Sequence, residues 1–320
     1  MTRRLVALAI ALAAALVVAA AASASQLIDR NATRVRLAVN ARGEALLTYR
    51  ARGGLHHVLA WGAVDARHPT SGQRQVRFQK DYAGGWGKYH GEYWRTFRNG
   101  CHGYDGPKLV YVVAACGAPD GSYWAVQSWQ TPLPDLGIPP WLPVQRAWEL
   151  HLSHWHGPTA QLEAWTDWVY SGRFQEVFGR LTYVGQPVYG FGTTRTGVPT
   201  DSFGRLVYLD TFNSKYGTGW KRENSFVTHK PTGIFCYGFF QFDPMKYPHP
   251  PGFPSTPRGP GTGEKYRLTV TGPGVTPDVS LVVPGLHDYN PSNPADVEYE
   301  RKQDALLFSM LGPDKACRHH

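Results

Sequence analysis

The stretch RAWELHLSHWHGPTAQLEAWTDWVY, residues 146–170, decides the fold, because apolar and polar side chains alternate along both of its halves. Alternation with a period of two is typical of half-buried β-strands. The even-numbered positions carry most of the apolar bulk: Trp148, Leu150, Leu152, Leu162, Ala164 and Trp168. Gly157-Pro158 separates the two halves and predicts a turn. We therefore expect an antiparallel hairpin of strands 146–156 and 161–170.

The odd-numbered positions of this hairpin are mostly polar or aromatic: Glu149, His151, Ser153, Trp155, Glu163, Trp165 and Asp167. Burying three unpaired carboxylates would cost several kcal/mol each, so we expect this face to be at least partly open to solvent. Sugars stack on aromatic rings and hydrogen-bond to carboxylates. The face therefore predicts a glycan site with His151, Trp155 and Trp165 as ligand-binding residues. The alternative is an ordinary solvated sheet face.

Catalysis on this face would need two carboxylates at a suitable spacing. Glu149, Glu163 and Asp167 are weak candidates, since carboxylates on adjacent strands fall near the roughly 5 Å gap of a retaining glycosidase. Among His151, His154 and His156 only the last two share a strand face, so no metal site is expected. The sequence contains no nucleophile elbow, no zinc-protease helix motif, no P-loop and no dinucleotide fingerprint, and no cofactor is expected.

Composition extends the β assignment to the whole chain of 320 residues. Gly 35, Pro 25 and 13% aromatic residues describe a turn-rich, aromatic-rich protein. We expect a mainly β fold with an antiparallel sandwich-type architecture and one C-terminal helix; an arrangement in two similar halves is one alternative. That helix is predicted over 295–311, with Asn293 as N-cap, Pro294 in the first turn and Gly312 after its end. Val297, Phe308 and Leu311 would pack inward.

A repeated pattern suggests an internal duplication. The spacing F-x3-Y-x2-G-W-x-[KR] runs from Phe78 to Lys88 and again from Phe212 to Arg222. If real, the repeat means two similar β domains or two halves of one sandwich; the alternative is chance in an aromatic-rich chain. Each Gly-Trp segment is expected to be a tight turn whose indole caps the core. The second copy has more polar neighbours, and so its ligand-binding candidates are Trp220, Arg222 and Glu223.

These patterns indicate where one part of the chain ends and the next begins. The proline-rich residues 132–143 mark the expected boundary between a first β-rich half at 26–145 and a second at 146–292. Residues 293–320 form the helix and a tail packed on the second half. Residues 243–263 hold many Pro and Gly and are expected to be a long loop.

The first 25 residues predict export. Arg3 and Arg4 precede an unbroken apolar run over 5–22, and Ala22-Ser23-Ala24 is a small-residue cleavage site. Residues 1–25 are therefore interpreted as a secretory signal peptide, which makes the protein secreted or extracytoplasmic. The alternative is an uncleaved anchor, because the run is just long enough to span a bilayer. Membrane attachment is expected only through that segment.

The four cysteines fit an oxidising location, because an even count in an exported chain favours disulfides. Of the three connectivities we favour Cys101–Cys116 with Cys236–Cys317. No C-x-x-C pair occurs, so a zinc ribbon and a thioredoxin-like motif are not indicated.

Charge narrows the choice of partner. There are 33 basic and 24 acidic side chains, scattered without a Lys/Arg run, so no nucleic-acid partner is expected. A glycan or cell-wall polymer is the expected partner. Three functions remain: a non-catalytic binding protein, a glycan-active hydrolase, and a structural envelope protein. Exposure of Trp155 and Trp165 would separate the first two from the third.

Overall fold

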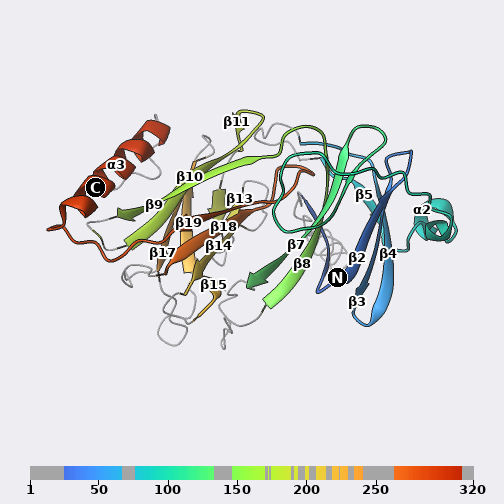
Figure 1. The fold of residues 1–320 in the computed structure, drawn as a ribbon, viewed down its shortest axis with the longest axis horizontal. Helices are drawn as coiled ribbons and strands as arrows, with labels where there is room; N and C mark the ends of the chain where they lie inside the picture. The colour runs from blue at the N-terminus through green and yellow to red at the C-terminus, as the bar shows by residue number, and fades with distance from the viewer. Residues whose placement is uncertain are drawn as a thin grey trace, which may run out of the picture.

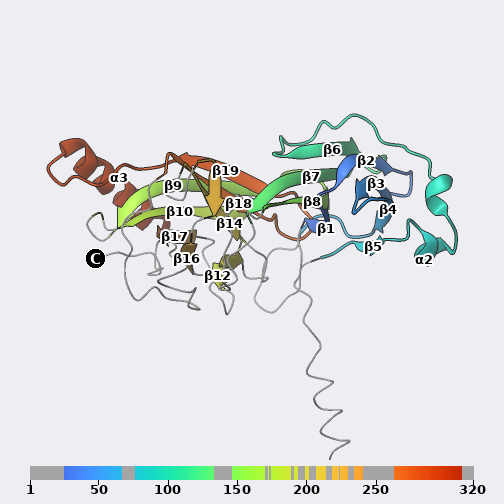
Figure 2. The same ribbon diagram turned by 90° about the horizontal axis from the view of Figure 1, so that it is seen from below.

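The computed structural model describes residues 25–66, 76–132, 146–169, 172, 174–188, 191–193, 199–201, 207–213, 218–222, 224–229, 234–240 and 263–311. The protein is mainly β, with antiparallel sheets and one long C-terminal helix, as its composition and alternation predict. Two lobes lie side by side along the long axis, with α3 at one end and α2 at the other (Figures 1 and 2). The predicted signal segment up to residue 24 lies outside the described residues, as does most of the predicted loop at 243–263.

The first lobe holds two four-stranded sheets. One has the order β1 (Gln26–Arg30), β8 (Arg146–Trp155), β7 (Tyr123–Pro132) and β6 (Val112–Gly117). The other is a simple meander of β2 (Thr33–Val39), β3 (Ala45–Ala51), β4 (Gly54–Trp61) and β5 (Gln79–Asp81). After β5 the chain forms two short helical turns, α2 (Trp86–Tyr89) and η1 (Tyr93–Arg95).

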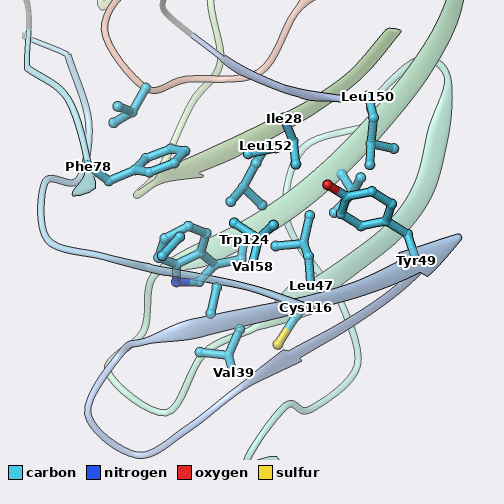
Figure 3. Packing of buried hydrophobic residues seen from close by; sticks show 14 of the residues in the cluster. Ile28, Val39, Leu47, Tyr49, Val58, Phe78, Cys116, Trp124, Leu150 and Leu152 are labelled. Carbon is cyan, nitrogen blue, oxygen red and sulfur yellow. The ribbon is translucent and has the colours of Figure 1, made fainter. Parts of the chain in front are cut away.

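The core of the first lobe lies between these two sheets (Figure 3). Leu47 and Val58 reach it from β3 and β4, and Trp124 and Leu150 from β7 and β8, all fully buried. The Cys101–Cys116 disulfide, with Cα atoms 5.4 Å apart, fastens β6 to the segment that follows η1. That pairing confirms the sequence-based assignment.

In the part that the structure describes, the second lobe holds three sheets. The five-stranded sheet contains β9 (Gln161–Val169), β10 (Phe174–Tyr183), β11 (Gln186–Pro187), β16 (Asn224–His229) and β17 (Ile234–Phe240), with β10 at its centre. A four-stranded sheet has the order β15 (Trp220–Arg222), β14 (Val207–Phe212), β18 (Lys265–Val270) and β19 (Val279–Pro284). Strands β12 (Phe191–Thr193) and β13 (Pro199–Asp201) form a separate pair.

Helix α3 (Pro294–Leu311) covers the outer face of β10 and β17. The Asn293 side chain accepts a hydrogen bond from the amide of Ala295 at 3.1 Å, which confirms the predicted cap. Leu307 and Leu311 are buried against Phe178 and Ile234. The predicted inward positions of Val297 and Phe308 are wrong, since these side chains are exposed. Cys236 beneath the helix is disulfide-bonded, and its expected partner Cys317 lies outside the described residues.

A loop from the second lobe inserts into the first. Residues 271–278, between β18 and β19, are all buried. Val275 belongs to the core of the first lobe, and its carbonyl accepts a hydrogen bond from the amide of His154 at 2.8 Å. In the other direction, Ala66 packs against the core of the second lobe. The two lobes therefore share buried surface.

The predicted hairpin of strands 146–156 and 161–170 is wrong. Strand β8 pairs with β7 and β1, whereas β9 pairs with β10. The sheets divide between Trp155 and Gln161, and the Gly157-Pro158 segment passes from one lobe to the other instead of closing a turn. Alternation fixes which side chains share a face of a strand, but it does not select the neighbouring strand.

The predicted duplication is also wrong. Trp86 begins the short helix α2, whereas Trp220 begins strand β15. The strand orders around them differ, because β5 closes a simple meander and β14 pairs with β18 from much later in the chain. The second tyrosine of the pattern, Tyr216, lies outside the described residues.

Within the described part of the chain, no helix is both long enough and apolar enough to span a membrane.

The two faces of α3 provide a test of how this helix docks. Leu307→Ala should lower the free energy of unfolding by about 2–5 kcal/mol, because it leaves a cavity against Phe178. Phe308→Ala, next to it on the exposed side, should change it by no more than about 0.5 kcal/mol. Urea unfolding of both variants measures the difference. Equal losses would place the apolar face of α3 elsewhere.

Candidate functional site

The polar residues of β8 form a buried network instead of a ligand face. Glu149 accepts a hydrogen bond from Arg30 at 2.8 Å and contacts His151 Nε2 at 3.2 Å. The other ring nitrogen of His151 lies 3.0 Å from Ser25 Oγ and 3.2 Å from a carboxylate oxygen of Asp278. Glu149 and His151 are each only 5% exposed. The expectation that they face solvent is therefore wrong.

Asp278 connects this network to the second lobe. Its carboxylate accepts hydrogen bonds from Ser25 Oγ and from the indole of Trp129, the latter at 3.0 Å. Its backbone exchanges two hydrogen bonds with the side chain of Gln127, at 2.8 and 3.0 Å. Residue 278 is the last of the inserted loop, so the network joins β1, β7 and β8 to the start of β19.

The charges within the network compensate one another. Burial would lower the pKa of His151, but Asp278 and Glu149 outweigh it and raise this pKa above its usual value. Burial would likewise raise the pKa of Glu149, yet hydrogen bonds from His151 and Arg30 hold it below its usual range. The raised pKa favours the protonated imidazole, which compensates the buried carboxylates of Glu149 on β8 and of Asp278.

The other candidates on this face do not form an open ligand-binding face either. Trp155 is fully buried beside Tyr104 and Tyr123. Trp165 lies on β9, where it stacks on Phe178 and packs beneath α3. Glu163 forms an ion pair with Arg180, its cross-strand neighbour. Because Glu149 belongs to the sheet of the first lobe, it does not share a face with the carboxylates of β9.

Asp167 is fully buried on β9 beneath α3, opposite Glu176 on β10. Burial and the nearby carboxylates of Glu176 and Asp304 raise the pKa of Asp167 to about 9. Its side chain is therefore neutral at pH 7. A buried neutral acid in a packed sheet serves the fold and offers no negative charge to a ligand.

The histidines of β8 do not gather into a metal site. His154 stacks on Trp124 and contacts the carbonyl of Ala63 at 2.9 Å, while His156 pairs with Asp65. Burial lowers the pKa of His154 to about 4, so it is neutral at pH 7. Across the described ranges, no group of three or more His, Cys, Asp or Glu residues is arranged to hold a metal ion.

The residues proposed from the second Gly-Trp segment are placed only in part. Trp220 is half-buried, with its ring beside Phe212 and under the guanidinium of Arg267 at 4.5 Å. Arg222 lies in β15 opposite Asp210. Glu223 lies outside the described residues. Trp220 is thus already engaged by neighbours within its own sheet.

Two exposed aromatic side chains, Tyr82 and Trp86, lie in the first Gly-Trp segment, and the half-buried rings of Tyr89, Tyr93 and Trp94 follow them in the chain. We call Tyr82, Trp86, Tyr89, Tyr93 and Trp94 the aromatic surface. Trp86 is 58% exposed and Tyr82 53% exposed, so the expectation that this indole caps the core is wrong. Large exposed aromatic groups on a fixed scaffold are typical of interaction sites. Trp86 and Tyr89 lie in α2, at the outer end of the first lobe (Figure 1).

Local backbone geometry holds this surface in place. Asp81 accepts hydrogen bonds from three backbone amides of the turn, those of Ala83, Gly87 and Lys88. Gly85 has φ +107°, and a Cβ there would lie 2.5 Å from the Cβ of Tyr93, so only glycine fits. The glycine pair before Trp86 was the sequence signal for a tight turn. Whether the indole of that turn is buried depends on packing, which a local pattern does not encode.

A buried acid supports the surface from below. Glu44 is 4% exposed. Its carboxylate forms an ion pair with Lys88 at 2.7 Å and accepts hydrogen bonds from the Asn40 amide at 2.8 Å and from the hydroxyl of Tyr89. Burial would raise the pKa of Glu44, but these donors lower it to about 2. Lys88 also lies 4.1 Å from the centre of the Trp61 ring. The rings of Tyr89 and Tyr93 are thereby held by charged partners.

A cavity of about 280 Å³ lies where the two lobes meet, lined by residues 107–110, 159–162 and 278–280. The carboxylate of Asp278 is already hydrogen-bonded within the buried network. The hydroxyl of Ser280 is likewise hydrogen-bonded to its neighbours Thr269 and Leu268. The polar side chains of Asp278 and Ser280 at this cavity are therefore committed to contacts within the protein.

No family model, curated protein or solved structure matches this chain. Its function must be inferred from the sites themselves.

The network around Asp278 predicts a large and specific loss of stability. Asp278→Ala should lower the free energy of unfolding by about 3–5 kcal/mol, because Trp129, Ser25 and a charged His151 lose a buried acceptor. Glu163→Ala, which breaks the exposed pair with Arg180, should cost no more than about 1 kcal/mol. Chemical denaturation measures both. Similar small losses would show that the network contributes little.

Asp167 predicts a dependence of stability on pH. Its pKa in the folded protein is about 9, far above that of an unfolded aspartate near 4, so stability falls as pH rises between these values. Asp167→Asn keeps the shape of the neutral acid and removes the titration. At pH 8 it should be more stable than the wild type by roughly 5 kcal/mol, about four pKa units at about 1.4 kcal/mol each, and at pH 4 the two should be similar. Denaturation at both pH values measures this, and a constant difference would contradict it.

Proposed function

We propose that this protein is exported by a signal peptide removed near Ser25, and that it binds glycans, without cleaving them, through the aromatic surface of the first lobe. The observation that carries the proposal is the exposure of Trp86 and Tyr82 on a turn fixed by Asp81 and two glycines. The C–H faces of sugar rings pack on exposed aromatic rings. Rings held in place beforehand lose little conformational freedom on binding.

The burial of the β8 face changes which of the three functions is favoured: binding protein, hydrolase or structural protein. Trp155 is buried and Trp165 is packed under α3, which favours a structural role for that face. The hydrolase alternative loses support, since Glu149 and Glu163 belong to different sheets and Asp167 is fully buried. Around the aromatic surface, the carboxylate of Glu44 is held by Lys88, Asn40 and Tyr89 and has a low pKa. A general acid needs the opposite environment, so binding is favoured over catalysis.

Two exposed tryptophans allow a matched test. A glycan array with the mature protein identifies a ligand, and calorimetry then measures its affinity. Trp86→Ala should weaken binding at least tenfold, which is about 1.4 kcal/mol. Trp148→Ala, a comparably exposed tryptophan on β8, should leave affinity unchanged. Binding that survives Trp86→Ala, or no glycan bound on the array, would overturn the proposal.

A further inference from the structure

The outer face of the sheet β2-β3-β4-β5 is divided into a covered half and an open half. On the covered half, Leu46 and its cross-strand neighbour Leu59 are buried although they face away from the core of the lobe. On the open half, Arg36, Thr48 and His57 stand side by side on neighbouring strands. Trp94 stacks on His57 with ring centres 4.1 Å apart, so the aromatic surface borders the open half.

The open half carries exposed cations. Arg50 follows Thr48 two residues further along β3, so it lies on the same face as Arg36, at a diagonal spacing of about 7–8 Å between Cα atoms. Both arginines are exposed, and neither forms an ion pair with any residue that the structure describes. Their guanidinium donors are available to a ligand.

Further cations lie on the aromatic rings themselves. Arg42 is placed 5.2 Å from the centre of the Tyr89 ring, and Arg95 lies 5.0 Å from that of Trp94. Their side chains are 58% and 61% exposed. Arg42 shares the single carboxylate of Glu44 with Lys88, which leaves an excess of positive charge there.

The acidic groups of this region are engaged with the protein. Glu44 is buried among its donors, and Asp81 caps the turn before α2. Glu92 pairs with Arg95 at 2.7 Å, although this pair is exposed and weak. Positive charge thus predominates beside the exposed ring of Trp86 and the half-buried ring of Trp94.

We propose that the ligands of this surface are acidic glycans, polymers that combine sugar rings with carboxylate, sulfate or phosphate groups. The inference rests on the proposed glycan-binding function and names its substrate class. Sugar rings pack on Trp86 and Trp94, while acidic groups accept paired hydrogen bonds from Arg36 and Arg50. A planar guanidinium matches a carboxylate or a phosphate, whereas a neutral sugar leaves both arginines without a charged partner.

The test compares one oligosaccharide with and without its charge. Tetragalacturonate and its full methyl ester have the same rings, and calorimetry at 50 mM salt measures the affinity for each. The acid should bind at least tenfold more tightly, and most of this difference should be lost at 500 mM salt, because exposed charges are screened. A glycerol-phosphate oligomer, measured in parallel, distinguishes phosphate from carboxylate as the preferred acidic group.

Variants separate the contribution of the arginine charges from that of stacking on Trp86. Arg36→Gln with Arg50→Gln should reduce binding of the acid to the level of the ester and leave the ester unaffected. Arg301→Gln, which removes one exposed charge from α3, should change neither. Trp86→Ala should weaken both ligands.

Each outcome has a defined meaning. Equal affinity for acid and ester would overturn the acidic preference and leave glycan binding in place. Failure of every glycan to bind would overturn both proposals. Tighter binding of a single-stranded oligonucleotide than of any acidic glycan would also overturn the inference, since stacked aromatic rings and cations can serve nucleic acids as well.

Discussion

The contact between Asp278 and His151 is the constraint on which the rest of the structure depends. One residue ends a loop of the second lobe, and the other lies in the central part of β8 in the first lobe. Neither could be buried alone, because an isolated charge in a protein interior is costly. Together with Glu149, Arg30 and Ser25 they form a compensated network, and the buried loop 271–278 follows from it.

This constraint decides where a ligand can bind. The inserted loop occupies the side of β8 that would otherwise be a polar and aromatic sheet face, and α3 covers the corresponding side of β9. The described part of the meander β2-β3-β4-β5 keeps an open half on its outer face. There the fixed turn before Trp86 presents rings to solvent, and Arg36 and Arg50 provide charge. The polar residues that stabilise the fold and the polar residues proposed to bind a ligand thus lie on different sheets.

The features that could be predicted from sequence are local. Alternation identified β2, β3 and β8, and Asn293-Pro294 identified the start of α3. The short loop between Cys101 and Cys116 made their pairing the simplest choice. The predictions that failed concern long-range pairing. Strand β8 pairs with β7, from which thirteen residues, 133–145, separate it, and no local sequence pattern predicts that pairing. Asp278 carries no signal of its own in the sequence, so the burial of Glu149 could not be foreseen. The exposure of Trp86 depends on packing at Gly85 and Tyr93 for the same reason.

Hydrogen exchange with and without an acidic oligosaccharide tests most directly the claim that β8 is structural and that the ligand surface lies on the other sheet. Mass spectrometry of the mature protein with tetragalacturonate should show slower exchange in residues 82–97 and in β3 and β4. Exchange in β8 and in residues 271–278 should be slow from the start and unchanged by the ligand. Ligand-dependent slowing in β8 or β9, with none in residues 82–97, would contradict the account.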